Sequence, residues 1–182
     1  MIKNKKQLNK ILKEEKKFYY TSYCMNKRDI INRVITRDPL IIIYKYIKYL
    51  RKSEYYYNCN NKLLYAFFRY KKNKLGIKLG LEIWENNFDS NLMIYHAGNI
   101  VVNRGAKIGK NCKLHGDNCI GNNGVTNKVP IIGDNVDIGV GAKIIGDVKI
   151  ANNIVIGAGA VVTKSFLEEG TVICGVPAKK IR

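Results

Sequence analysis

The fold of this chain is decided by residues 102–162, of which residues 131–150 read IIGDNVDIGVGAKIIGDVKI. A branched aliphatic residue recurs there every six positions, often with glycine after it, as at Gly133 and Gly139. The aliphatic positions are Val102, Ile108, Leu114, Ile120, Ile132, Ile138, Ile144, Ile150, Ile156 and Val162, and only Thr126 interrupts them. This period indicates a hexapeptide parallel β-helix, a tube in which three short strands make one triangular coil. We expect the aliphatic residue to fill the tube and the glycine to adopt the unusual dihedral angles of a corner.

The repeat divides the chain into a basic α-helical region at residues 1–80, a β-helix at residues 81–170 and a C-terminal tail at residues 171–182. Helices are predicted over 3–17, from Pro39 to about Tyr57, and over 62–74 with an end near Gly76. Asp38 before Pro39 is a typical helix start. Residues 81–83 and 92–94 are predicted as the first, irregular strands. Residues 122–129 lack the inward aliphatic and should form a loop.

Positive charge is concentrated in the first part of the chain. Residues 1–80 hold 21 Lys and Arg against 5 Asp and Glu, whereas the rest hold 11 against 9. This excess reflects either A/T-rich codons or attraction to anionic partners such as nucleotide sugars, lipid pyrophosphates or a membrane face. No nucleic-acid recognition motif accompanies it. The N-terminus lacks the apolar stretch of a signal peptide, and the apolar run 40–50 is too short to span a bilayer.

The cysteine pattern predicts a cytoplasmic protein without zinc. The chain has 5 cysteines, an odd count, and no CxxC pair. Cys112 stands at a small position of the repeat, where it is expected to fill the core.

The chain has only two histidines, His96 and His115, and both fall in the early coils. They are nineteen residues apart, about one coil, and neighbouring coils are about 4.8 Å apart. We therefore expect the two rings to be neighbours on one edge of the tube. His96 stands where the six-residue period calls for an aliphatic residue, so the local chain must deviate to turn this side chain outward.

A family resemblance adds to this interpretation. Residues 94–102 (IYHAGNIVV), the repeats that follow and residues 175–179 (GVPAK) resemble the hexapeptide-repeat acyltransferases. The nearest branch is the serine O-acetyltransferase-like group, with its relatives from surface-polysaccharide loci. The resemblance covers residues 80–182. It implies a left-handed β-helix, a homotrimer or a dimer of trimers with active sites between subunits, and acetyl-CoA as acyl donor with no metal.

The resemblance also implies roles for individual residues. His96 is the expected general base, paired with Glu82, for which Asp89 and Asp117 are rivals. Tyr95, His115 and Asp117 are the expected acceptor-binding residues. The residues expected to contact CoA are Gly141, Ala142, Gly159 and Ala160, where small side chains permit close approach, and Lys164, Lys179 and Lys180, which could hold its phosphates.

Two departures bear on the acceptor. Tyr95 stands where serine acetyltransferases carry an aspartate, and Val129 stands where they carry a histidine before proline. An amino acid needs charged partners, so we expect the acceptor to be a sugar hydroxyl of a surface-polysaccharide intermediate. The alternatives are a serine O-acetyltransferase of cysteine biosynthesis and a non-enzymatic scaffold. A glycan enzyme could also contact the inner membrane face through its basic region.

Overall fold

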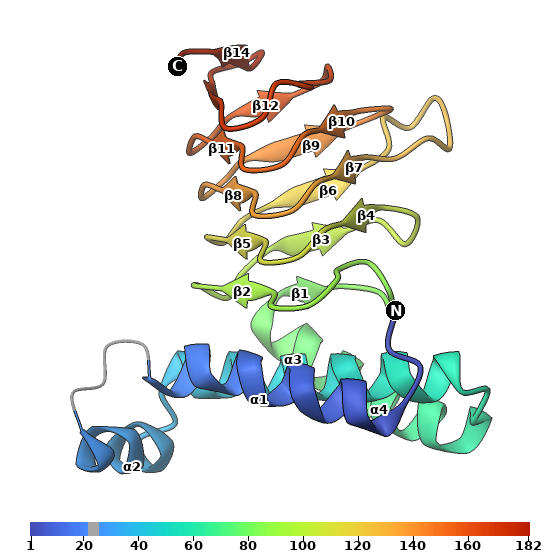
Figure 1. Ribbon diagram of the computed structural model, residues 1–182, viewed down its shortest axis with the longest axis vertical. Helices are drawn as coiled ribbons and strands as arrows, with labels where there is room; N and C mark the ends of the chain where they lie inside the picture. Colours follow the sequence, from blue (N-terminus) through green and yellow to red (C-terminus); the bar gives the residue numbers. More distant parts are fainter. Residues whose placement is uncertain (22–25) are drawn as a thin grey trace. The chain divides into compact units, whose positions relative to one another are not determined.

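The computed structural model describes residues 1–21 and 26–182, which form two compact units, Met1–Leu79 and Gly80–Arg182. The first unit is helical and the second is a tube of short strands (Figure 1). The helices are α1 (Lys5–Thr21), α2 (Lys27–Ile35), α3 (Pro39–Asn58) and α4 (Lys62–Leu79). None of the described helices is both long and apolar enough to cross a membrane.

The helix starts follow local signals in the sequence. At α3, the Asp38 carboxylate accepts a hydrogen bond from the Leu40 amide (2.8 Å) and Pro39 takes the first helical position, as predicted. Helix α2 was not predicted, although Asn26 and Asp29 form a reciprocal capping box at its start. Helix α4 was predicted to end near Gly76. It continues to Leu79 instead and stops before Gly80, whose φ is +65°.

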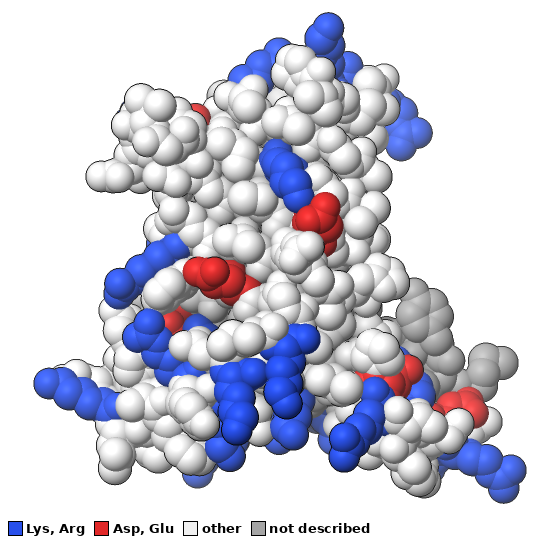
Figure 2. Space-filling model, turned by 180° about the vertical axis from the view of Figure 1, so that it is seen from behind, with Lys and Arg blue, Asp and Glu red and all other residues white. Residues whose placement is uncertain are grey.

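The helical unit is built around α3, which packs against both α1 and α4. Its core includes Ile43, Ile47 and Leu50, all fully buried. A charged cluster is buried beside them: the Arg51 guanidinium contacts the carboxylates of Glu15 and Glu54. The remaining basic residues are mostly exposed, and Figure 2 shows Lys and Arg side chains gathered over this unit.

The second unit consists of three sheets, which form the three sides of a tube. Sheet A contains β1 (Leu81–Glu82), β3 (Ile100–Val102), β6 (Cys119–Gly121), β9 (Lys143–Ile145) and β12 (Val161–Val162). Sheet B contains β4 (Lys107–Ile108), β7 (Ile131–Ile132) and β10 (Lys149–Ile150). Sheet C contains β2 (Met93–Ile94), β5 (Lys113–Leu114), β8 (Asp137–Ile138), β11 (Val155–Ile156), β13 (Val172–Cys174) and β14 (Lys179–Lys180). Every pairing is parallel except that of β13 with β14.

The interior of the tube is filled as the six-residue period predicts. Every aliphatic residue on the period from Val102 to Val162 is buried. Cys112 is also fully buried inside the tube, and burial raises the pKa of its thiol. Burying a Val, Leu or Ile side chain contributes about 1.5–3 kcal/mol each, so these stacked rows stabilise the narrow core.

The predicted reason for the glycines was wrong. Gly109 and Gly139 do not have positive φ; a Cβ at Gly109 would instead lie 2.6 Å from the carbonyl carbon and oxygen of Gly133 on the next coil. The glycine after the aliphatic residue is therefore needed for close approach between coils. The left-handed corner positions are taken largely by asparagine, as at Asn111, Asn135 and Asn153.

Those asparagines form a ladder along one corner of the tube. Each side-chain amide donates to the side-chain oxygen one coil further on: Asn91 to Asn111 (2.9 Å), Asn111 to Asn135 (2.8 Å) and Asn135 to Asn153 (2.9 Å). The ladder pairs side-chain amides at these tight corners, although Oδ1 of its first member, Asn91, is buried without a hydrogen-bond partner in the described chain.

The coils differ in length but stay in register. Val102 pairs with Ile120 eighteen residues on, whereas Ile120 pairs with Ile144 twenty-four residues on. The additional six residues form the loop predicted at 122–129, most of which is exposed. After the interruption at 164–170, β13 resumes pairing with β11, and β14 then turns back along it.

Candidate functional site

Most residues expected to act lie along one edge of the tube, where a strand of sheet C turns into a strand of sheet A. We call this the C–A edge; it consists of the turns 95–99, 115–118, 139–142 and 157–160. These turns follow β2, β5, β8 and β11 at successive levels of the tube. The structure therefore brings Tyr95, His96, His115, Asp117, Gly141 and Gly159 to one edge, although they span more than sixty positions of sequence.

The two histidines are neighbours on this edge, as expected. A Cβ added to Gly116, which follows His115, would lie 3.3 Å from the Cβ of His96. The first coil deviates as expected: Ile94 is the inward residue of β2 and pairs with Leu114 twenty positions on, two more than a regular coil. The two additional residues leave the His96 side chain exposed to solvent.

His115 is held by two neighbours. Its Nε2 lies 2.8 Å from Oδ1 of Asp137, and the Tyr95 ring stacks on the imidazole with centroids 4.6 Å apart and planes 12° apart. The other Asp137 oxygen lies 3.2 Å from Nζ of Lys113. Asp137 was missed in the sequence. Coil counting could have found it, because it stands one long coil after Lys113.

The turn after His115 is fixed by a buried amide. The Asn118 side chain accepts from the Gly116 amide (3.1 Å) and donates to the carbonyl oxygen of Gly139 (2.8 Å). Asp117, beside it, is exposed, has φ of +51° and forms an ion pair with Lys143 (3.1 Å). Asn118 was not singled out in the sequence, yet it joins two levels of the C–A edge.

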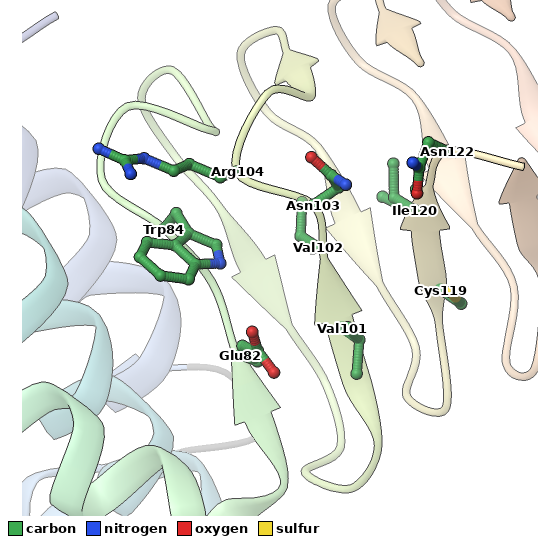
Figure 3. A pocket seen from close by; sticks show the side chains of 10 residues that line it. Glu82, Trp84, Val101, Val102, Asn103, Arg104, Cys119, Ile120 and Asn122 are labelled. Carbon is green, nitrogen blue, oxygen red and sulfur yellow. The ribbon is translucent and has the colours of Figure 1, made fainter. Parts of the chain in front are cut away.

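Glu82 lies apart from this edge, on the outer face of sheet A. Figure 3 shows it beside Val101, in a pocket of about 400 Å³ that also includes Trp84 and Arg104. The Arg104 guanidinium lies 5.5 Å from the Trp84 ring centroid. Among the described residues, no hydrogen bond joins His96 to Glu82 or to its rivals Asp89 and Asp117.

The residues expected to contact CoA have mixed placements. Gly141 and Gly159 have φ of +74° and +66°, and a Cβ at Gly159 would meet nothing within 4 Å, so the edge is open there. The methyl groups of Ala142 and Ala160 are fully buried in the tube. Their side chains therefore cannot line an outer groove, and only their backbone could contact a ligand.

The lysines expected to hold phosphates lie near the end of the chain. Lys164 lies 5.6 Å from the centroid of the Phe166 ring. Lys179 and Lys180 are exposed on β14, and Lys180 is paired with Glu168 (2.7 Å). Lys180 is thus the one of the three with a carboxylate partner in the described chain.

The C–A edge can support proton transfer at an exposed surface. An exposed imidazole can take a proton from a hydroxyl, and a second imidazole is oriented by a carboxylate. Backbone N–H groups at corners can stabilise an oxyanion. In residues 1–21 and 26–182, no group of three or more His, Cys, Asp or Glu side chains is arranged to hold a metal ion.

The chain is 30% identical to a serine acetyltransferase of Buchnera aphidicola subsp. Schizaphis graminum over 86% of this chain and 67% of that protein. The serine acetyltransferase of Neisseria gonorrhoeae, solved in complex with serine, has a TM-score of 0.72, 26% identity and coverage of 96% of this chain and 69% of its own. The enzyme of Brucella abortus strain S19, solved with coenzyme A, has a TM-score of 0.77, 22% identity and coverage of 97% and 68%. No protein-family model matches the chain.

These relatives overturn the preference for a glycan acceptor, which was wrong. That preference assumed that Tyr95 and Val129 remove the charged partners of an amino acid. The structure shows other polar groups on the C–A edge, including the Asp117 carboxylate and the His115 imidazole, so two substitutions do not decide the acceptor. The surface-polysaccharide branch is likewise not supported.

The predictions of fold and enzyme class agree with the comparisons. The fold is a left-handed parallel β-helix that follows an α-helical region in the sequence, as predicted. The prediction of an acyltransferase is confirmed. The similarity to the Buchnera protein extends through both the helical region and the repeats, over two thirds of that protein. This chain therefore belongs to the serine acetyltransferase family.

Proposed function

We propose that this protein is a serine O-acetyltransferase, which transfers the acetyl group of acetyl-CoA to the hydroxyl of L-serine and releases CoA. The observation that supports this most is the similarity to a serine acetyltransferase over most of the chain. The C–A edge supplies groups that the reaction needs, namely an exposed imidazole, nearby charged side chains and open glycine positions.

In the proposed reaction, His96 removes the proton from the serine hydroxyl as the oxygen attacks the thioester carbonyl. The tetrahedral oxyanion is stabilised by backbone N–H groups of a corner turn. Collapse of the intermediate breaks the C–S bond, and the imidazolium returns the proton to the CoA sulfur. Tyr95, His115 and Asp117 contact the amino acid. Glu82 lies on the neighbouring face of sheet A, where its carboxylate is available to a cationic group of the substrate.

CoA is proposed to lie along the open part of the C–A edge. Gly141 and Gly159 let its pantetheine arm approach the backbone, including the backbone of Ala142 and Ala160. Lys164 and Lys179 are the proposed phosphate partners. Lys180 would have to leave Glu168 to join them, so it is the weaker candidate.

The proposal includes a homotrimer, because a narrow tube of few coils leaves flat apolar faces that a second copy can cover. Exposed outward residues of this kind include Val101, Ile131 and Val155. Acetyl-CoA and free serine are cytoplasmic metabolites, so the enzyme is proposed to act there. The membrane contact expected of the basic region depended on lipid-linked sugars, and a free amino acid acceptor removes its reason.

The test is an acceptor panel. Purified protein is incubated with acetyl-CoA and either L-serine, nucleotide sugars or no acceptor, and free thiol release is followed together with mass detection of O-acetylserine. Turnover with L-serine well above the acceptor-free rate is expected. Thiol release with a sugar and none with serine would refute the proposal.

A further inference from the structure

Asp137 occupies a position that the proposed reaction does not yet use. It lies on β8, one level beyond His115, and its carboxylate is 27% exposed. One oxygen meets the His115 ring at 2.8 Å and the other meets Lys113 at 3.2 Å. The Tyr95 ring covers one face of the same imidazole. His115 is thus held at one edge and on one face by groups from two different coils.

The backbone makes this arrangement rigid. Strands β5 and β8 pair in register, with Lys113 opposite Asp137, and the His115 amide donates to the carbonyl oxygen of Ile138 (3.2 Å). Gly116, directly after His115, has φ of +109° and is tied down through Asn118. The backbones that carry His115 and Asp137 are therefore held in register by the pairing of two coils.

The pair also decides which ring nitrogen carries a proton. An ionised carboxylate only accepts hydrogen bonds, so Nε2 of His115 must be the donor to Asp137. Nδ1 then remains as the nitrogen available to another group. A carboxylate that orients an imidazole in this way fixes both its tautomer and its direction.

We propose that Asp137 is a positioning residue of the acceptor site, which holds His115 so that its ring contacts the bound amino acid. This rests on the proposed serine acetyltransferase function. His115 is suited to the role because it adjoins His96 across Gly116, so an acceptor whose hydroxyl reaches His96 lies within one coil of the second ring. Asp137 itself does not touch the substrate.

The kinetic test compares Asp137→Asn and His115→Gln with two controls in the full chain. Asp134→Asn removes a carboxylate of the same coil that binds the Lys110 amide (2.8 Å), and Lys113→Gln removes the other partner of Asp137. We expect Asp137→Asn and His115→Gln each to raise KM for L-serine roughly tenfold to a hundredfold, as for a lost hydrogen bond to a charged group. KM for acetyl-CoA should stay within about twofold, and both controls should resemble the wild type.

The double variant separates positioning from independent action. If Asp137 acts through His115, then Asp137→Asn adds nothing in a His115→Gln background, whereas independent effects multiply. Equal effects of Asp137→Asn and Lys113→Gln, multiplying effects in the double variant, or an unchanged KM for serine would each overturn the proposal. Far-UV circular dichroism of every variant excludes loss of fold as the cause.

A second measurement does not depend on activity. The chain has only two histidines, so ¹⁵N imidazole spectra can be assigned with the His115→Gln variant. We expect the Nε2–H tautomer at His115 in the wild type and loss of that preference in Asp137→Asn. An unchanged tautomer would refute the positioning role. If the wild type shows this tautomer but does not acetylate serine, the proposed function fails while the role of Asp137 in holding the ring stands.

Discussion

Arg51 and Glu15 form an ion pair sealed inside the helical unit, with Nη2 and Oε1 2.7 Å apart and side-chain exposures of 1% and 0%. Arg51 also contacts Glu54 at 2.9 Å, so one guanidinium serves two carboxylates. Burial alone would lower the pKa of Arg51, but these carboxylates raise it above its ordinary value. We expect Arg51→Met to lower the free energy of unfolding by about 3–5 kcal/mol, because two buried carboxylates lose this guanidinium.

Urea denaturation of the full chain, followed by far-UV circular dichroism, measures this loss. Lys10→Met is the control, because Lys10 and Glu14 form an exposed pair at 4.0 Å that should contribute little. A loss below about 1 kcal/mol for Arg51→Met would contradict the assigned role, given the usual cost of breaking a buried pair.

The spacing between coils can be tested at one glycine. Gly109→Ala places a methyl group against the backbone of Gly133, and overpacking of this kind costs about 1–3 kcal/mol. Gly121→Ala is matched to it, because its added Cβ would meet only the Cβ of Asn103 at 3.8 Å. Thermal unfolding should show a clear loss for the first variant and almost none for the second. Equal melting temperatures would show that the coils can move apart freely.

The asparagine ladder gives a graded prediction. Asn135→Ala removes hydrogen bonds to Asn111 and Asn153 and puts alanine at φ of +57°. The hydrogen bonds are worth about 1 kcal/mol each and the left-handed backbone costs alanine about 1–2 kcal/mol. Asn135→Gly loses the same hydrogen bonds, but glycine adopts the left-handed backbone without cost. It should therefore be the less destabilised variant in urea titrations. The reverse order would mean that the backbone conformation is not what asparagine provides here.

Stability should fall in alkali through Tyr44. Its hydroxyl donates to the carbonyl oxygen of Leu12 (3.1 Å), and burial, followed by the charge of Glu15, raises the pKa of this phenol to about 12. Above pH 10 the unfolded chain loses the phenol proton while the folded chain keeps it. The folded state then binds more protons, so stability decreases from pH 10 to about 12, by roughly 2–3 kcal/mol.

The check on Tyr44 is the pH dependence of urea midpoints in the wild type and in Tyr44→Phe. The variant loses a hydrogen bond at pH 8 but should show a shallower decline in alkali. If the urea midpoints of the two proteins fall in parallel as the pH rises, a group other than Tyr44 causes the loss of stability in alkali.

His96 is expected to dominate turnover. His96→Ala should lower kcat with L-serine by at least about 10²-fold, the usual contribution of a general base, with little change in KM for acetyl-CoA. A scaffold protein would not show this loss. The measurement is thiol release under saturating acetyl-CoA. Full activity in the variant would show that another residue is the general base.

The tube was predictable because the inward position repeats in the sequence: one residue in six must be apolar, and Ile132, Ile138 and Ile144 show the period directly. The reason why glycine follows the aliphatic residue was not predictable, because contact between coils depends on which backbone atoms approach one another. Helix α2 was missed although Ile30, Ile31, Val34 and Ile35 stand at helical spacing and Asn26 and Asp29 carried its start. With nine residues it is shorter than the window in which such a period is read.

Some features of the candidate site could also be predicted from the sequence, and others could not. His96 and His115 could be placed on one edge by counting residues, because coil length converts sequence separation into position. Asp137 was missed because the loop at 122–129 lengthens that coil to twenty-four residues; counting with the loop included places Asp137 opposite Lys113, beside His115. Glu82 stands fourteen residues before His96, near the spacing that the resemblance implies, but it belongs to β1 and lies on the outer face of sheet A.

The loop at 122–129 leaves the winding unchanged: Ile131 still pairs with Lys107 before it and with Lys149 after it. Val125 near its tip is 87% exposed. The tube thus tolerates an insertion at this point without a change in the pairing of any strand. A fluorescent label or an affinity peptide inserted beside Val125 should be carried as an appendage by an otherwise native protein.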